Sequence, residues 1–290
     1  MASLKELRNK IGVIESTRKV TDAMKLVAGV KLRKSEQKAE ASREYASTLH
    51  SILAKIRREF IDVESELFFG RKHEKTVLLV VLASDRGLCG NFNYLVGKET
   101  MNIVQNLQTE GKNVRIICIG NKIRDILKKF SDSFEKMELL EGFYRSNDIY
   151  ENSKKLAEKI VSEFMSGKVD KVGIIYTRYY SAMNHSVELK NIIPLSCEPN
   201  NDKTDTVFEP NAEKVLNDLL PFNITIQIYQ AVLESIASEQ SSRMTSMDNA
   251  TRNADNLLSE FKMQYNRTRQ AKITLELVEV ISGAKAIAKE

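Results

Sequence analysis

The chain of 290 residues contains no tryptophan, only four prolines and only three cysteines. Cys89, Cys118 and Cys197 are widely spaced and fit neither a metal site nor a disulfide framework, so we expect reduced thiols. No apolar run approaches the ~18 residues that a membrane-spanning helix needs. The first residues mix acids with bases and lack the apolar core of a secretory signal. We therefore expect a chain that starts here and stays in a cytosolic compartment.

Proline is absent outside one short stretch. All four prolines lie between residues 194 and 221. Because proline breaks helix interiors, two long proline-free arms around a distinct middle predict helices at both ends of the chain. The sequence divides accordingly into an N-terminal coiled-coil helix at 1–60, a central domain at 75–195 and a C-terminal coiled-coil helix at 211–290.

The first arm has apolar residues at steps of three and four, which is the pattern of a coiled-coil helix. The predicted stripe consists of Leu4, Leu7, Ile11, Ile14, Val20, Met24 and Val27, and later of Ala46, Leu49, Leu53, Ile56 and Phe60. The arm is also basic, since residues 1–60 hold 14 Lys and Arg against 7 Asp and Glu. Such a face can serve nucleic acid, an anionic membrane or an acidic protein surface, or can simply be solvated.

The last arm is expected to begin near Pro221, which suits a first helical turn, after a short helix at 211–219. Ile224, Ile228 and Ala231 open its apolar stripe. Neither arm can bury its stripe alone, so the two are expected to pair as an antiparallel coiled coil. The second arm is longer, so its last ~20 residues, from Lys272 on, should overhang with apolar groups around much of the helix. This overhang predicts an enclosing sleeve from another protein.

In the middle of the chain, the apolar residues form continuous runs instead of recurring at helical steps of three and four. Three continuous apolar runs have the length of buried parallel strands: 76–83, 114–119 and 172–177. Helical segments are expected between them, near 92–110, 121–130 and 151–166. This alternation predicts a small α/β domain, Rossmann-like, with a mostly parallel sheet, to which residues 185–193 could add an edge strand.

Signs of catalysis are weak. Residues 84–91, Ser-Asp-Arg-Gly-Leu-Cys-Gly-Asn, form a glycine-rich turn after the first strand and could cradle phosphate. They match neither of the two glycine-rich phosphate-binding patterns, G-x-G-x-x-G and G-x-x-x-x-G-K-[ST]. The three histidines are isolated, and no acid pair stands at a cleft-like position. We therefore expect no catalytic residues, no cofactor and no metal, and a chain that is not itself an enzyme.

Motifs along the whole chain resemble those of the γ subunit of F-type ATP synthases, of the bacterial type. The matching segments are Thr-Arg-Lys-Val-Thr at 17–21 with Ala-Met at 23–24, the turn at 84–93, Ser-Glu-Gln-Ser-Ser-Arg-Met at 238–244, and Ile-Thr-x-Glu-x-x-Glu-x-x-x-Gly-Ala at 273–284. The resemblance implies a central rotor inside a ring of α and β subunits. It also implies a foot on the membrane rotor ring beside the ε subunit, at the cytoplasmic face of the bacterial inner membrane.

The resemblance also implies which residues contact other subunits. Met24 and Lys25 would lie near an acidic lever segment of the β subunits, with Arg243 at a similar level. The full set implied is Met24, Lys25, Arg86, Cys89, Glu209, Arg243, Arg269, Gln270, Thr274 and Glu276. Arg269, Gln270 and Thr274 would face the upper part of the ring, and Glu209 would belong to the foot.

Two other functions stay open from the residues alone. A coiled-coil arm protein could bind nucleic acid through its basic first helix, although Tyr45 is the one aromatic residue before Phe60 and offers no stacking platform. The middle domain could instead be a nucleotide-dependent enzyme. Salt-dependent binding of DNA or RNA would support the first, and saturable nucleotide binding by the isolated chain the second.

Overall fold

The computed structural model describes residues 3–59, 66–71, 74–144, 148–181, 184–195 and 212–287. Its two compact units are Met1–Ala28 with Met244–Glu290, the paired-helix unit, and Gly29–Arg243, the sheet unit. Glu209, Cys197 and Phe60 lie outside the described residues. The expected division into domains at 1–60, 75–195 and 211–290 stays a prediction.

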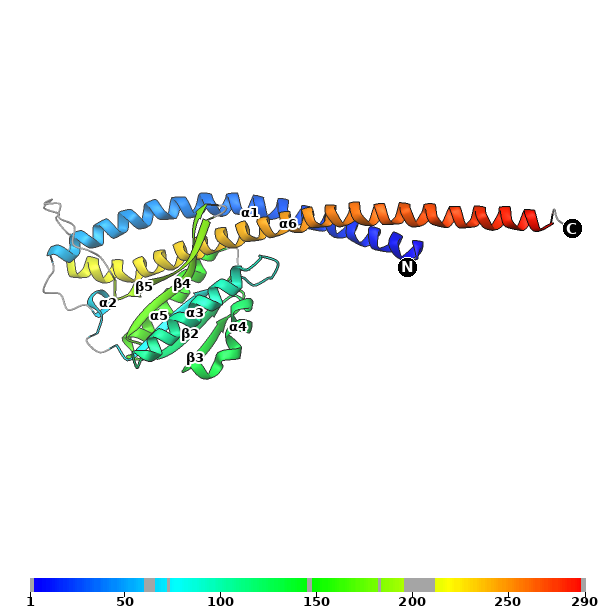
Figure 1. Cartoon of the computed structure of the whole chain (residues 1–290). Helices are drawn as coiled ribbons and strands as arrows, with labels where there is room; N and C mark the ends of the chain where they lie inside the picture. The colour runs from blue at the N-terminus through cyan, green and yellow to red at the C-terminus, as the bar shows by residue number, and fades with distance from the viewer. Residues whose placement is uncertain are drawn as a thin grey trace. The chain divides into compact units, whose positions relative to one another are not determined.

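Two long helices dominate the element order (Figure 1). The helix α1 spans Leu4–Glu59, which confirms the helix predicted for the first arm. The helix α6 spans Ala212–Ile287 without a break, so the predicted separate helix at 211–219 is wrong. Pro221 lies inside α6 because its fixed φ is helical and only one backbone hydrogen bond is lost. The neighbouring Leu220 and Ile224 are buried, and their packing offsets that cost.

In the paired-helix unit, the start of α1 packs antiparallel against α6. Leu7 is buried on α1, and Ala254 and Leu258 are buried on α6. Two ion pairs fix the register: Lys25 Nζ lies 2.5 Å from Asp248 Oδ1, and Arg18 Nε lies 2.9 Å from Asp255 Oδ1. The expected antiparallel pairing of the two arms is confirmed here.

The seam of α1 differs by one residue from the predicted stripe. Val20 and Val27 are 58% and 55% exposed, whereas Thr21 and Ala28 are 9% and 1% exposed. A heptad step of seven from Leu7 leads through residue 14 to these two small residues. Small side chains let the helix backbones approach closely, and the hydroxyls of Thr21 and Thr251 lie 2.8 Å apart across the seam. The sequence argument followed the larger apolar residues, which face outward.

The sheet unit holds a five-stranded sheet in the order β3-β2-β1-β4-β5. Its strands are β1 Thr76–Leu82, β2 Asn113–Ile119, β3 Lys136–Leu140, β4 Lys171–Ser181 and β5 Asn184–Ile193. All neighbouring strands are parallel except β4 and β5, which form an antiparallel edge. Both the mostly parallel sheet and the edge strand near 185–193 are therefore confirmed.

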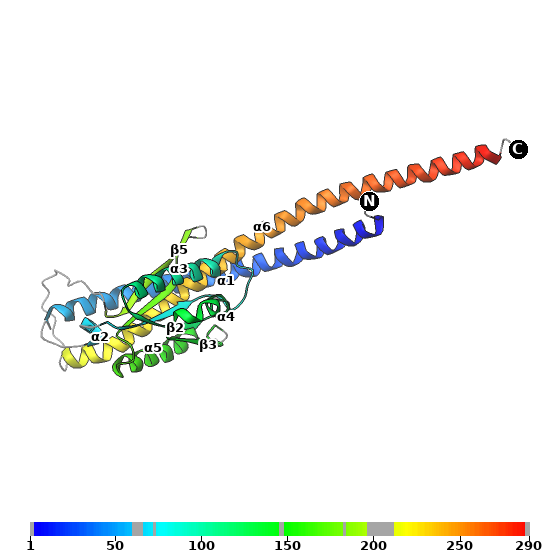
Figure 2. The same ribbon diagram turned by 60° about the horizontal axis from the view of Figure 1, so that its bottom comes forward.

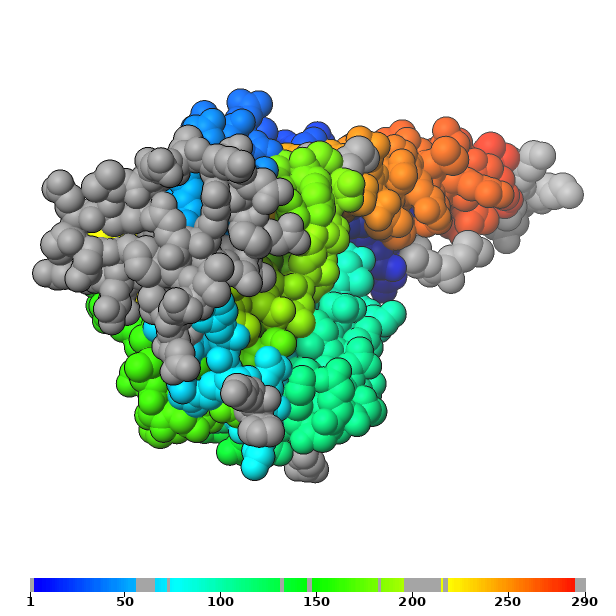
Figure 3. All heavy atoms as spheres, turned by 90° about the vertical axis from the view of Figure 1, so that its left-hand side faces the viewer, coloured from blue at the N-terminus to red at the C-terminus, as the bar shows by residue number. Residues whose placement is uncertain are grey.

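Helices cover both faces of this sheet, which explains why its central strand is apolar throughout. They are α3 Phe92–Thr109, α4 Asn121–Leu127, α5 Ile149–Met165 and the first part of α6. Val77, Leu79 and Val81 of β1 pack against α3 and α4. The alternate residues Leu78 and Val80 pack against α5 and α6. Figure 3 shows the surfaces of α3 (teal) and the β4–β5 hairpin (light green) next to each other.

Three short elements were not predicted. They are α2 Glu66–Phe69, the 3-10 helix η1 Lys128–Ser133 and the strand β3. The strand β3 lies at the sheet edge and is half-buried, so its sequence Lys-Met-Glu-Leu-Leu lacks the continuous apolar run of the central strands. Met137 and Leu139 still point to the same side of the sheet and pack on the α3 and α4 side.

Replacing Pro221 by alanine tests the continuity of α6. Inside a helix, proline is about 3 kcal/mol less favourable than alanine. Its replacement also raises the conformational entropy of the unfolded chain, which offsets up to about 1 kcal/mol of the gain. Because the ring of Pro221 is exposed, we expect P221A to stabilise the sheet unit by about 2 kcal/mol in urea unfolding. Asn106→Ala, at an exposed position of α3 in the same unit, is the control and should gain only a few tenths of a kcal/mol. A gain for P221A no larger than the control's would mean that the helix begins at Pro221.

Candidate functional site

The end of α6 in the paired-helix unit has no partner helix. The residue numbers of both the Lys25–Asp248 and the Arg18–Asp255 pairs add to 273, which places Leu4, the first residue of α1, opposite residue 269. Every described side chain from 269 to 284 is exposed. Figures 1 and 2 both show α6 continuing past the first turn of α1. The predicted overhang is therefore confirmed.

Apolar side chains cover more than half of the circumference of this overhang. Six of them are about half exposed or more: Ile273, Leu275, Leu277, Val278, Val280 and Ile281. Successive residues of a helix are 100° apart, so this set spans an arc of about 220°, much wider than one stripe, and Lys272, Glu276 and Glu279 lie in the remaining sector. A single neighbouring helix could cover only one side of such a surface. The overhang therefore has the chemistry of a helix end that is enclosed.

The predicted contact residues Arg269, Gln270, Thr274 and Glu276 lie on the same overhang, and all are exposed. Their described interactions stay within α6: the Thr274 hydroxyl donates to the Gln270 carbonyl at 3.0 Å, and Lys272 Nζ lies 3.7 Å from Glu276 Oε1. Among the described residues, no hydrogen bond or ion pair joins any of the four to another element.

Met24 and Lys25 lie at the helix pair and are half-buried. The hydrogen bond from Lys25 lowers the pKa of Asp248 below its usual range, and Arg252 of α6 adds to this effect at 2.9 Å. The charge of Lys25 is thus balanced within this chain. Part of the side chain remains open, with 39% of its area exposed.

The loop after β1, residues 83–91, is held from within. The backbone N–H of Ser84 donates to Asn93 Oδ1 at 3.0 Å, and Asn93 Nδ2 donates to Cys89 Sγ at 3.2 Å. Cys89 is 1% exposed, so its side chain faces the interior of its own chain. Leu88 takes a positive φ of 63° and is 64% exposed, and Arg86 is exposed as well. The loop therefore offers Arg86 and Leu88 to the outside.

Arg243 of α6 fastens this loop. Its guanidinium lies 2.6 Å from Glu239 Oε1 and donates to the carbonyls of Arg86 and Gly87 at 3.4 and 3.3 Å. Burial raises the pKa of Glu239 above its usual range, although the Arg243 guanidinium opposes that shift. Of the predicted contact residues, the structure thus brings Arg86, Cys89 and Arg243 together. Lys25 and the overhang residues belong to the paired-helix unit.

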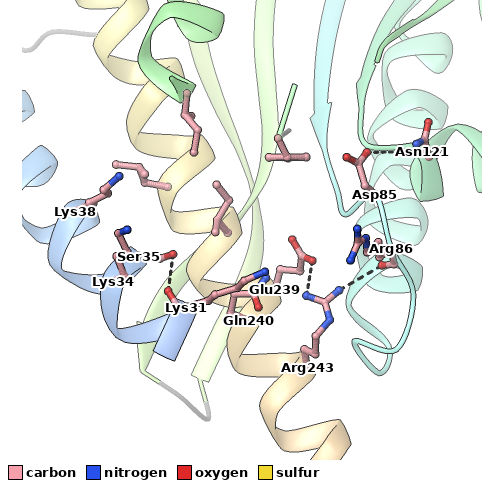
Figure 4. A pocket seen from close by; sticks show the side chains of 14 residues that line it. Lys31, Lys34, Ser35, Lys38, Asp85, Arg86, Asn121, Glu239, Gln240 and Arg243 are labelled. Atoms are coloured by element: carbon pink, nitrogen blue, oxygen red, sulfur yellow. Dashed lines mark hydrogen bonds and ion pairs between the residues drawn. The ribbon is translucent and has the colours of Figure 1, made fainter. Parts of the chain in front are cut away.

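The sequence argument missed a cavity of about 560 Å³ in the sheet unit. Figure 4 shows it between lysines of α1, residues of α6 and the loops after the parallel strands. The only signal in the sequence was the spacing of Lys31, Lys34 and Lys38, which places three cations on one side of a helix.

The described residues contain no cluster of three or more His, Cys, Asp or Glu that could hold a metal ion. Burial raises the pKa of the Cys118 thiol to about 12, which disfavours a reactive thiolate. Among the described helices, none is long and apolar enough to cross a membrane.

Arg243→Gln should destabilise the sheet unit in a pH-dependent way. Without the guanidinium, the folded-state pKa of Glu239 rises further above its unfolded value. The penalty for the buried carboxylate is then absent below the unfolded pKa and grows as pH rises through the folded pKa. We expect R243Q to lose about 1.5–3 kcal/mol of unfolding free energy at pH 8 and less at pH 5. The E239Q/R243Q double variant should lose this pH dependence. If the unfolding free energies of R243Q and the parent chain differ by the same amount at every pH, the role given to the Arg243–Glu239 pair is wrong.

Comparisons with known proteins agree with this architecture. A family model described as ATP synthase matches residues 3–287. The ATP synthase gamma chain of Rhodospirillum rubrum is 39% identical over 303 residues, and that of Dinoroseobacter shibae is 40% identical over 292 residues. Each comparison covers 99% of this chain and 100% of the relative.

Solved structures show the same fold. A chain of the Euglena gracilis mitochondrial ATP synthase (OSCP/F1/c-ring, rotational state 3) has a TM-score of 0.64 at 20% identity, covering 98% of this chain and 94% of that one. A chain of the Tetrahymena thermophila enzyme (central stalk and c-ring) has a TM-score of 0.59 at 23% identity, covering 80% and 99%. On the family match and the full-length relatives, this chain belongs to the ATP synthase gamma-chain family.

Proposed function

We propose that the chain is the central rotor shaft of an F-type ATP synthase. It couples proton-driven rotation of the membrane ring to ATP synthesis and hydrolysis at catalytic sites on the β subunits. The observation that carries this proposal is the overhang of α6, residues 269–284, with apolar side chains over more than half of its circumference. The full-length relatives are gamma chains of ATP synthases, which supports a place for this chain in such a complex.

The overhang needs an enclosing partner on energetic grounds. Fully burying a Val, Leu or Ile side chain contributes about 1.5–3 kcal/mol, so six such residues offer on the order of 10 kcal/mol. Part of this is spent on the entropy of association. A ring of α and β subunits is a partner that can cover all sides of a helix at once.

The outward valines of α1 extend the same argument. Val13, Val20 and Val27 recur every seven residues and are 55–65% exposed in the paired-helix unit. They form a second apolar stripe on α1, which is exposed, whereas the seam that faces α6 is buried. The two helices therefore present different surfaces at different angles around their common axis. Rotation of such an asymmetric pair changes which contacts each catalytic subunit makes, and only this difference in contact energy can shift the subunits between states.

The remaining parts of the proposal concern partners and place. The chain is non-catalytic, binds the α and β subunits, the ε subunit and the membrane c-ring, and lies at the cytoplasmic face of the bacterial inner membrane. The titles of the similar solved structures name the central stalk, F1 and the c-ring of their own complexes. No cofactor, metal or nucleic acid is part of this proposal.

The contact residues keep their proposed roles. Met24, Lys25 and Arg243 meet the acidic lever segments of β, and Arg269, Gln270, Thr274 and Glu276 meet the upper part of the ring. Arg86 and the loop around Cys89 face the lower ring, where the buried Cys89 acts by shaping the loop. Glu209 belongs to the foot.

Removing the overhang should weaken the coupling of proton pumping to ATP hydrolysis and leave the folding of the chain unchanged. In a chain that ends at Ala271, all of the removed side chains that the structure describes are exposed, so thermal unfolding should stay cooperative, with a midpoint within a few degrees of the parent. In a complex reconstituted into vesicles, we expect fewer protons pumped for each ATP hydrolysed. The matched control is Lys272→Ala, which keeps the apolar groups and should leave that ratio unchanged. Loss of cooperative unfolding, or normal coupling in the truncated complex, would count against the proposal.

Co-expression with the cognate α and β subunits tests the assignment as a whole. We expect the chain to co-purify at one copy per ring and to raise steady-state ATP hydrolysis above that of α and β alone. A chain that elutes by itself and leaves hydrolysis unchanged would refute the rotor role.

A further inference from the structure

The cavity in the sheet unit lies where α/β proteins hold ligands. Asp85 and Arg86 line it from the loop after β1, Asn121 from the start of α4 just after β2, and Tyr144 from the segment after β3. All three are parallel strands, and their carboxyl ends meet at one edge of the sheet. The sheet also reverses its strand order beside β1, because β2 lies on one side of it and β4 on the other. Ligands of open α/β sheets bind outside the carboxyl ends of the strands, and the residues that line this cavity follow β1, β2 and β3 rather than β4.

One side of this cavity is positively charged. Lys31, Lys34 and Lys38 of α1 line it at steps of three and four residues, so all three reach the same space. Within the described residues none of the three has an ion-pair partner, and Arg86 has none either. Figure 4 shows the lysines on one side of α6 and Arg86 on the other.

The acids of the cavity are already engaged. Glu239 pairs with Arg243 at 2.6 Å, and Asp85 Oδ1 accepts the backbone N–H of Asn121 at 3.2 Å. Five cationic side chains and two carboxylates line the cavity, which leaves a net charge of +3. Like charges around a shared space repel one another, and an anion between them would relieve that repulsion.

The other wall is apolar. Leu233 and Ile236 of α6 line it, with Ile149 at the start of α5 and the ring of Tyr144. The cavity of about 560 Å³ is of the size that holds a drug-sized molecule and is larger than a bare phosphate ion requires. A ligand that fills it needs both an anionic group and an apolar, ring-sized part.

We propose that this cavity binds a phosphate-bearing organic anion of nucleotide size. Its phosphate lies among Lys31, Lys34 and Lys38, and its ring packs on Tyr144 and Ile236. The site belongs to the sheet unit and is separate from the overhang of α6 on which the rotor proposal rests.

Isothermal titration of the full chain at about 0.15 M salt, where surface charges are largely screened, tests this site. The probes are ADP, pyrophosphate and adenosine. We expect ADP to bind at one site per chain, adenosine to show no binding, and pyrophosphate to bind at least tenfold more weakly than ADP. Hydrogen exchange should show protection of residues 84–91 when ADP is present.

Two paired variants identify the cavity as the place of binding. K34Q/K38Q removes two cavity lysines and should weaken ADP binding at least tenfold. K19Q/R33Q removes the same charge from exposed positions of α1 outside the cavity and should leave ADP binding within twofold. Circular dichroism melts establish that both variants fold like the parent.

Three outcomes would overturn the proposal. The first is no saturable binding of ADP up to about 1 mM, because a Kd of 1 mM corresponds to a binding free energy of only about 4 kcal/mol. The second is equal affinity for pyrophosphate and ADP, because the apolar wall would then take no part. The third is an equal loss in both double variants, which would indicate attraction to net charge alone.

Discussion

The long helix α6 must cover its apolar side chains, and most of the structure follows from how it does so. Ile224 and Ile228 are fully buried under the sheet, where α6 completes the same layer as α5. Ala254 and Leu258 are buried against α1. From 269 to 284 no described part of the chain covers the helix. A helix of this length gains its stability from packing rather than from propensity, so each stretch of α6 requires its own partner.

Charged pairs decide how the two long helices align. Arg18 with Asp255 and Lys25 with Asp248 set the register in the paired-helix unit. In the sheet unit, Arg43 pairs with the buried Glu234 at 2.9 Å and also donates to the carbonyl of Tyr179 at 2.7 Å. Such pairs add little net stability, but a slipped register would leave a charge such as Glu234 buried without a partner. They therefore serve alignment more than stability.

The sequence predicted the fold well where its pattern is simple. Continuous apolar runs identified β1, β2 and β4, and the lack of proline identified both long helices. It failed where a small or polar residue takes the buried position, as Thr21 and Ala28 do in place of Val20 and Val27. It failed also at Pro221, where packing around Leu220 and Ile224 outweighs a local helix breaker. The cavity could not be predicted, because Lys34 and Asn121 are brought together only by the tertiary fold.

The close seam at Thr21 and Ala28 has a mechanical consequence. Two helices packed together resist twisting far better than one, because torsional stiffness rises steeply with the thickness of a rod. The paired-helix unit is thick as far as residue 269 and a single helix beyond it. An applied torque would therefore wind the single-helix end most. By this argument, that end is the part of the unit with the lowest torsional stiffness.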